Sequence, residues 1–275
     1  MTMNHPNILV TDSDGIVSIE ISRRDKKNAI TGDMYRAMSE ALFHARDHHH
    51  VRAVLIRGQD DLFTAGNDLT DFLHRKAGDP SAAIPFLHLL SSFEKPLVAA
   101  VAGNAVGIGT TLLLHCDLVY AADNAKFQLP FVNLALCPEA GSSLMLPRVA
   151  GYQRAAELLL LGEPFDAATA REAGFVNRVV AADQLMSTAL AAAQKLAALP
   201  AQSLAVTKAL MKRPPDRSAI EAMDEEVIYF SDLVAAPAAK EIFSAFLEKR
   251  IPNPENEVSV QANVGFPDVK RSGRN

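Results

Sequence analysis

Residues 96–116 read PLVAAVAGNAVGIGTTLLLHC and contain no charged side chain. A run of this length could cross a bilayer as one helix. Its many glycines and polar residues, however, would weaken such a helix and leave little apolar surface for lipid. The run instead predicts a buried strand over 97–101, a glycine-rich turn, and a buried helix over 108–115. We therefore expect no membrane span here.

Strand and helix signals alternate on both sides of this run. Upstream, apolar residues at 17, 19 and 21 alternate with polar ones, and 51–57 is rich in branched apolar residues, so both segments are predicted strands. Thr31 can cap a helix between them. A further strand is predicted over 118–121, and beyond Gly151 helical patterns dominate. Strand–helix units followed by helices indicate an α/β core with a helical C-terminal region.

Size and composition agree with that organisation. The chain has 275 residues, of which 49% are hydrophobic, enough for a full core. We expect the α/β core to span 1–200 and the helical region to span 201–250. The segment 251–275 carries prolines, asparagines and few large apolar residues, and it is predicted to be a loose tail.

Charge and cysteine content limit the partners and the compartment. The net charge is −5, which disfavours a nucleic-acid binder but still allows a local basic patch that holds an anionic small molecule. The two cysteines, Cys116 and Cys137, are too few for a disulfide scaffold and favour a reducing, cytoplasmic setting. The first residues lack the pattern of a signal peptide.

Several cofactor and metal motifs are absent from the sequence. It contains no P-loop, no HExxH and no GxSxG. A dinucleotide fingerprint begins at Gly107 and Gly109 but fails at Leu112. The histidines 48–50 are consecutive, so their side chains point in different directions, and we interpret them as a solvated helix end. The sequence thus predicts neither a metal site nor a separate cofactor.

Three segments together indicate a site. They are LFTAGNDL at 62–69, AGNAVGIG at 102–109, and PEAGSS at 138–143. The first two can each present a backbone N–H at the start of a helix, where donors lack partners within the helix. Two such donors aimed at one point would form an oxyanion hole. The third segment adds a glutamate, Glu139.

The order and spacing of these segments resemble the crotonase (enoyl-CoA hydratase/isomerase) superfamily, and the resemblance runs from 24–30 to 246–250. It implies a ββα spiral core with an acyl-CoA site, a helical C-terminal trimerisation region, and a homotrimer or a dimer of trimers. It also implies a coenzyme A thioester substrate, so that coenzyme A is part of the substrate rather than a cofactor. The N–H groups of Asn67 and Ile108 would bind the thioester oxygen.

The branch of the family follows from the acidic residues. Hydratases use two glutamates, and by our alignment this chain has Thr111 and Phe131 in their places. Glu139 lies in a turn that resembles that of peroxisomal-type Δ3,Δ2-enoyl-CoA isomerases, which carry one catalytic glutamate. One carboxylate can take a proton from C2 and return one at C4, because it is a base first and an acid afterwards. We expect Phe131, Leu134 and Leu136 to form an apolar wall that raises its pKa.

The resemblance also suggests residues that bind the rest of the substrate. Lys27 and Ala65 would lie beside the adenine and phosphate end of coenzyme A. We also assign Asp68, Leu69 and Phe131 to the residues that bind the substrate, with Asp68 capping a helix rather than acting as an acid. Phe246 and Lys249 match a C-terminal pattern that reaches the coenzyme A of a neighbouring subunit.

Three alternatives stay open at this stage. Glu139 could simply complement a helix dipole. Within the family, the reaction could be hydration of a 2-enoyl-CoA or isomerisation of a ring-derived acyl-CoA rather than a step in fatty acid breakdown. In another class, the chain could resemble the RNA-binding relatives of the family, although its net charge of −5 disfavours them.

Overall fold

The computed structural model describes residues 5–73, 81–213 and 216–252. The chain divides into two compact units, Met1–Leu199 and Pro200–Asn275. Almost all of the predicted tail, from 253 onward, lies outside the described residues. The candidate site belongs to the first unit.

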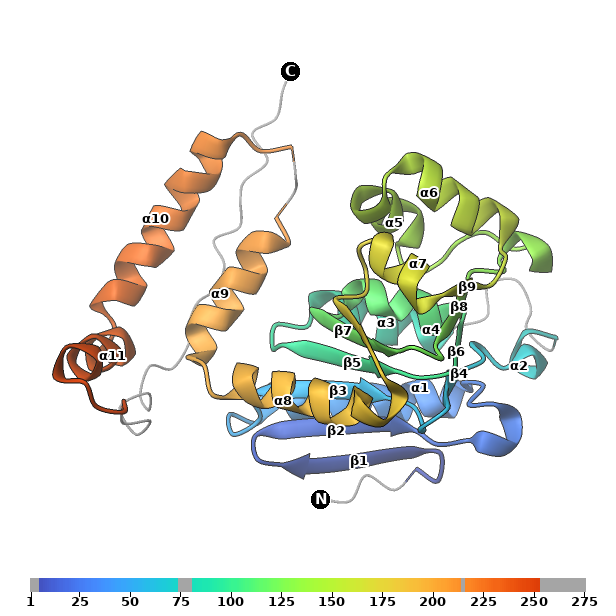
Figure 1. Ribbon diagram of the computed structural model, residues 1–275, viewed down its shortest axis with the longest axis horizontal. Helices are drawn as coiled ribbons and strands as arrows, with labels where there is room; N and C mark the ends of the chain where they lie inside the picture. The colour runs from blue at the N-terminus through green and yellow to red at the C-terminus, as the bar shows by residue number, and fades with distance from the viewer. Residues whose placement is uncertain (1–4, 74–80, 214–215, 253–275) are drawn as a thin grey trace. The chain divides into compact units, whose positions relative to one another are not determined.

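The larger sheet of the first unit has six strands in the order β1-β2-β3-β5-β7-β10 (Figure 1). β1 and β2 pair antiparallel, and the other neighbours pair parallel. The strands are β1 Ile8–Ser13, β2 Ile16–Ile21, β3 Ala53–Arg57, β5 Leu97–Val101, β7 Leu118–Ala122 and β10 Arg178–Val180. The predicted strands are therefore present, joined by β1 and β10, which the sequence patterns did not single out.

Side chains of this sheet alternate between two buried faces, as a period of two requires. Val54 and Ile56 of β3 pack on the face that is covered by α1 (Gly32–Asp47). Ala53 and Leu55 pack on the opposite face, which is covered by α8 (Leu185–Ala197). Helices thus shield both faces, which is typical of a largely parallel sheet.

A smaller sheet of four strands, in the order β4-β6-β8-β9, carries the loops of the candidate site. Its strands are β4 Leu62–Thr64, β6 Asn104–Val106, β8 Lys126–Gln128 and β9 Phe165–Asp166. β4 and β6 run parallel, so their carboxyl ends meet at one edge. Phe63 and Thr64 of β4 are fully buried, and pairing with β6 satisfies the backbone of this short strand.

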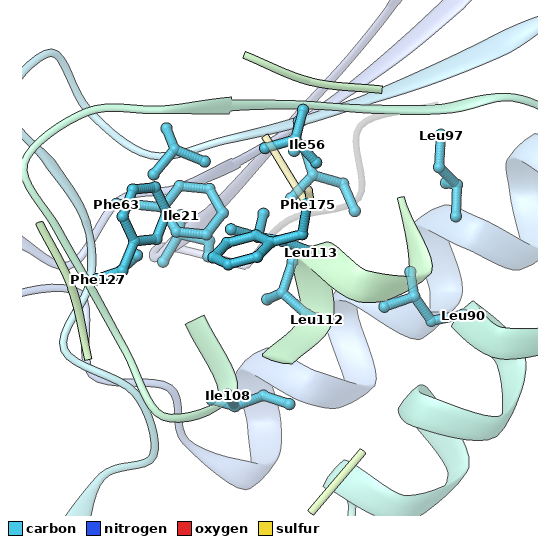
Figure 2. Close-up of a cluster of buried hydrophobic side chains, with 14 of the residues drawn as sticks. Ile21, Ile56, Phe63, Leu90, Leu97, Ile108, Leu112, Leu113, Phe127 and Phe175 are labelled. Atoms are coloured by element: carbon cyan, nitrogen blue, oxygen red, sulfur yellow. The ribbon is translucent and has the colours of Figure 1, made fainter. Parts of the chain in front are cut away.

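One hydrophobic cluster joins the two sheets. Figure 2 shows Phe63 of β4 and Phe127 of β8 beside Ile21 and Ile56 of the larger sheet. Ile108 and Leu112, from the helix that follows β6, enter the same cluster. Because the smaller sheet and this helix share one core with the larger sheet, the loops at its edge start from fixed positions.

The uncharged run 96–116 has the predicted strand at its start and a helical segment at its end, but the predicted glycine-rich turn between them contains the short strand β6. It forms β5, β6, α4 (Ile108–Thr111) and a 3₁₀ turn over Leu112–His115. Most residues of the run are buried inside the protein, which explains why none is charged. Within the described ranges, no helix is long and apolar enough to cross a membrane.

Helices form most of the rest of the described chain. The remaining helices of the first unit are α2 Leu69–Leu73, α3 Ala83–Ser92, α5 Ser142–Ala150, α6 Tyr152–Ala156 and α7 Ala167–Glu172, with a π-helical turn over Glu157–Leu161. The second unit contains α9 Ala201–Met211, α10 Ala219–Ala235 and α11 Pro237–Glu248. α10 begins with a capping box in which Ser218 and Glu221 each accept from the other's backbone amide.

Candidate active site

Two glycine-bearing loops touch at the carboxyl ends of β4 and β6. Gly66 has a φ of +91°, and a Cβ built on it would lie 2.7 Å from the carbonyl oxygen of Val106. A Cβ on Gly109 would lie 2.5 Å from the Cγ2 atom of Thr64. No real Cβ approaches that closely, so glycine at both positions allows the loops to meet and brings Asn67 near the start of α4.

The backbone amides of Asn67 and Ile108 follow β4 and β6, and of these two residues Asn67 lines the cavity described below while Ile108 does not. Ile30 brackets Asn67, donating to the carbonyl of Gly66 (2.8 Å) and accepting from the amide of Asp68 (2.9 Å). Ile108 is the first residue of α4, whose leading amides have no partner within the helix. Among the described residues, no protein oxygen accepts a hydrogen bond from either amide. Two donors of this kind can stabilise one oxyanion.

The turn that carries Glu139 is held by three hydrogen bonds. Ser142 donates to the carbonyl of Glu139 from both its amide (3.0 Å) and its hydroxyl (2.7 Å). The ring of His115 donates from Nε2 to the carbonyl of Ala140 (2.8 Å). Ala140 and Gly141 both have positive φ, at 54° and 69°. These contacts set the direction of the Glu139 side chain.

The carboxylate of Glu139 has one polar partner among the described residues. The hydroxyl of Thr111 donates to its Oε1 atom over 2.5 Å. Burial raises the pKa of Glu139, and the hydrogen bond from Thr111 partly opposes that shift. Within the described ranges no lysine, arginine or histidine forms an ion pair with it. A carboxylate in such surroundings is suited to exchange a proton.

Glu139 faces a largely apolar cavity of about 590 Å³. The residues that line it come from α3 and the segment before it, α5, the Glu139 turn, the Asn67 loop and the 3₁₀ turn that ends at His115: Asn67, Ser81, Ile84, Leu87, His88, Ser91, His115, Glu139, Ala140, Gly141, Leu144 and Met145. Glu139 supplies the one carboxylate among these lining residues. The cavity therefore combines one carboxyl group, polar groups such as Asn67 and apolar walls, as small-molecule sites do.

The apolar wall lies elsewhere than we predicted. Phe131, Leu134 and Leu136 do not line the cavity. Phe131 packs into the core with 6% of its surface exposed, while Leu134 and Leu136 are about half exposed at the protein surface. The wall is formed instead by apolar residues of α3 and α5. The spacing of these residues places them on one helix face, but no sequence motif marks that face as part of a site.

Tyr35 is a polar neighbour of the site that our sequence reasoning missed. Its hydroxyl donates to the side-chain oxygen of Asn67 over 2.6 Å, and its ring is buried. Burial raises the pKa of Tyr35 well above its usual value, and the charges of Glu139 and Asp71 add to the shift. Tyr35 therefore stays neutral and fixes the Asn67 side chain. Its place on an ordinary helix gave no signal of this role.

The predicted substrate-binding residues of the first unit differ in their contacts and in their exposure. The carbonyl of Lys27 accepts from the amide of Ala65 (2.9 Å), which brings these two residues together. Asp68 pairs with Arg23 (2.6 Å) and caps α2 by accepting from the amide of Thr70 (3.0 Å). The side chain of Leu69 is exposed.

The two predicted C-terminal substrate residues lie in the second unit. Phe246 belongs to α11, and 81% of its surface is exposed. Lys249 ends that helix in the left-handed conformation. Their roles as contacts of coenzyme A stay predictions.

Comparisons with known proteins agree with this geometry. The model of the family described as enoyl-CoA hydratase/isomerase matches residues 11–257. Rat enoyl-CoA delta isomerase 2 is 38% identical over 80% of this chain, which spans 57% of the length of that relative. The Mycobacterium bovis protein named probable enoyl-CoA hydratase echA8 is 32% identical over 91% of this chain and 98% of its own length.

Solved structures show the same fold. A protein from Magnetospirillum magneticum AMB-1, named as an enoyl-CoA hydratase/carnithine racemase, is 45% identical with a TM-score of 0.88. The match covers 91% of this chain and 99% of that protein. The chain therefore belongs to the enoyl-CoA hydratase/isomerase family, within the crotonase superfamily, and has its α/β fold with C-terminal helices.

Proposed function

We propose that this protein is an acyl-CoA isomerase that moves a C3=C4 double bond to C2=C3. The observation that carries the proposal is Glu139, the single carboxylate among the described residues that line the cavity, with Thr111 hydrogen-bonded to it where a hydratase would have a glutamate. Hydration needs a positioned water and two carboxylates in this family. Isomerisation needs one group that removes a proton and then returns one.

Each part of the site has a role in this reaction. The thioester oxygen accepts from the amides of Asn67 and Ile108. Glu139 removes a proton from C2, so that a dienolate forms with its negative charge on that oxygen. The protonated Glu139 then delivers a proton to C4, which completes the shift and regenerates the carboxylate. Each oxyanion donor contributes roughly a hundred- to a thousandfold in rate.

The surroundings of Glu139 match the second half of the cycle. A carboxylic acid that donates to a carbon needs a proton affinity closer to that of the carbon than an exposed glutamate has. Burial raises the pKa of Glu139 in that direction. The apolar walls of the cavity also exclude water that could protonate or hydrate the intermediate.

The test is Glu139→Gln assayed with a 3-enoyl-CoA, with the absorbance of the conjugated thioester as readout. Glutamine keeps the size of the side chain but accepts no proton, so we expect kcat to fall by about a thousandfold or more. A loss below about tenfold, which is about 1.4 kcal/mol of barrier, would remove Glu139 as the proton carrier. Formation of 3-hydroxyacyl-CoA from a 2-enoyl-CoA at a comparable rate would assign the chain to the hydratases instead.

A further inference from the structure

Three polar side chains from separate elements converge outside the candidate active site. Asp12 comes from β1, the edge strand of the larger sheet, and His44 from the last turn of α1. His50 comes from the turn between α1 and β3. The Oδ2 atom of Asp12 lies 2.8 Å from Nε2 of His44 and 2.9 Å from Nε2 of His50. One ligand atom from each residue lies within 4.8 Å of the other two.

We propose that Asp12, His44 and His50 form a binding site for a zinc ion. Two imidazole nitrogens and one carboxylate oxygen form a donor set that binds zinc. Such a set favours zinc and other borderline divalent metals over calcium or magnesium. Zinc bonds of about 2.0–2.2 Å place tetrahedral ligand atoms about 3.3 Å apart. The contacts to Asp12 need to open by only about half an ångström to reach that spacing.

The protein already directs both rings at one oxygen. Each Nε2 carries a hydrogen in the ion-free arrangement, since it donates to Asp12. To bind zinc, each neutral ring must carry its proton on Nδ1 instead of Nε2. This tautomer frees the lone pair of Nε2 for the ion. Water completes the coordination on the open side, where His50 is more than half exposed.

The backbone around the site is braced by contacts outside the three ligands. Lys95 donates from Nζ to the carbonyls of Ala45 (2.6 Å) and His48 (2.8 Å), at the end of α1. The ring of His48 packs against that of His44, with centroids 4.1 Å apart. The amide of Arg52 donates to the carbonyl of Gly15 (2.7 Å) and ties the turn to the β1–β2 hairpin. The backbone that carries the three side chains is therefore held in place by contacts that need no ion.

This site also revises our interpretation of the histidine run. Three consecutive histidines do not converge on one ion, as their spacing indicates. His50 instead meets partners that lie 6 and 38 residues away along the chain, which no local pattern reveals. A bound ion would link the edge strand β1 to the end of α1. Because the ion would bind the folded state and not the unfolded state, it would stabilise the folded protein.

The experiment is calorimetric titration of the purified protein with zinc chloride, together with thermal unfolding with and without zinc. We expect one saturable site in the wild type and a higher Tm with zinc. His50→Gln and His44→Gln should each lower the affinity at least tenfold and remove the rise in Tm. His49→Gln is the matched control, because it removes a neighbouring imidazole of the same run that lies outside the cluster.

The outcomes separate this site from adventitious binding. Zinc held by the exposed thiol of Cys137 would remain in His50→Gln, so only the equivalent that this variant loses belongs to the proposed site. Absence of a saturable site in the wild type would overturn the proposal. An equal loss in His49→Gln, or no loss in His50→Gln, would also overturn it. Circular dichroism of the zinc-free variants shows whether they fold as the wild type does.

Discussion

The turn that carries Glu139 and the loop that carries Asp68 flank the same cavity, yet they treat a carboxylate in opposite ways. Asp68 pairs with Arg23 over 2.6 Å and caps a helix, and these hydrogen bonds lower its pKa. Glu139 has a threonine hydroxyl in place of a cation, and burial raises its pKa. One carboxylate is stabilised as an anion, and the other is kept able to take up a proton.

The difference separates a structural acid from a proposed catalytic one. Above its unfolded pKa, the lowered pKa of Asp68 means that ionisation stabilises the fold. The raised pKa of Glu139 means that its ionisation near neutral pH costs stability. Such a cost is expected where a side chain is placed for chemistry rather than for folding.

Moving each carboxylate by one methylene group gives the largest expected contrast. Glu139→Asp keeps the charge but withdraws it from C2 and C4 of the substrate, and a displacement of about 1 Å can cost about a hundredfold in rate. We expect kcat with a 3-enoyl-CoA to fall by about that factor. Asp68→Glu is the matched control and should leave kcat within about threefold. Similar losses in both variants would show that the two acids are not functionally distinct.

Thr111 offers a smaller test of the same contrast. Thr111→Val removes the hydrogen bond to Oε1 of Glu139 with little change in volume. Because that bond lowers the pKa of Glu139, its loss should raise the pKa further. The acidic limb of the kcat/KM profile should move to higher pH, and the rate at neutral pH should fall by about tenfold, as expected for a hydrogen bond to a charged group.

Thr111→Ser is the control for this measurement. Serine keeps the hydroxyl, so the pH profile should return toward that of the wild type. A merely structural role for Thr111 would lower the rate of the valine variant without moving the acidic limb. An unmoved limb in Thr111→Val would therefore contradict a direct effect on Glu139.

The sequence predicted the buried elements of the fold better than the short ones. β5 spans the predicted 97–101, and α1 begins after Thr31, whose hydroxyl accepts from the amide of Met34. A long apolar pattern of this kind predicts one type of secondary structure, because its apolar side chains must all be buried on one face or inside the core. β4, β6, β8 and β9 have two or three residues each, and their pairing depends on partners far along the chain.

Parts of the candidate site were likewise predicted from local sequence signals, and other parts were not. Glycines at 66 and 109 and the PEAG turn are local signals: the two glycines let their loops meet, and Asn67 and the PEAG turn line one cavity. Tyr35 and the apolar wall from α3 carry no local signal, because any apolar helix face looks the same before it packs. The hydrogen bond between Thr111 and Glu139 was also not predicted, although the sequence analysis names both residues.

The smallest predicted effect concerns stability rather than rate. Asp68 and Arg23 are largely buried as a pair, with 14% and 18% of their side chains exposed, whereas Asp61 and Arg24 form a similar contact with 57% and 60% exposed. Asp68→Asn should lower the free energy of unfolding at pH 7 by about 1 kcal/mol, since it removes the ion pair with Arg23 but keeps a side-chain oxygen that can cap α2. Asp61→Asn should lower it by less than about 0.5 kcal/mol.

The dependence on pH identifies the cause of that loss. The hydrogen bond from Arg23 holds the folded pKa of Asp68 below its usual value of 3.8, so the contribution of Asp68 is complete above that value and disappears as the pH falls through the folded pKa. The gap between wild type and Asp68→Asn, measured by urea unfolding, should therefore shrink as the pH drops below about 3.8. A gap that stays constant across this range would show that Asp68 stabilises the loop through packing, and its contrast with Glu139 would then rest on shape rather than on charge.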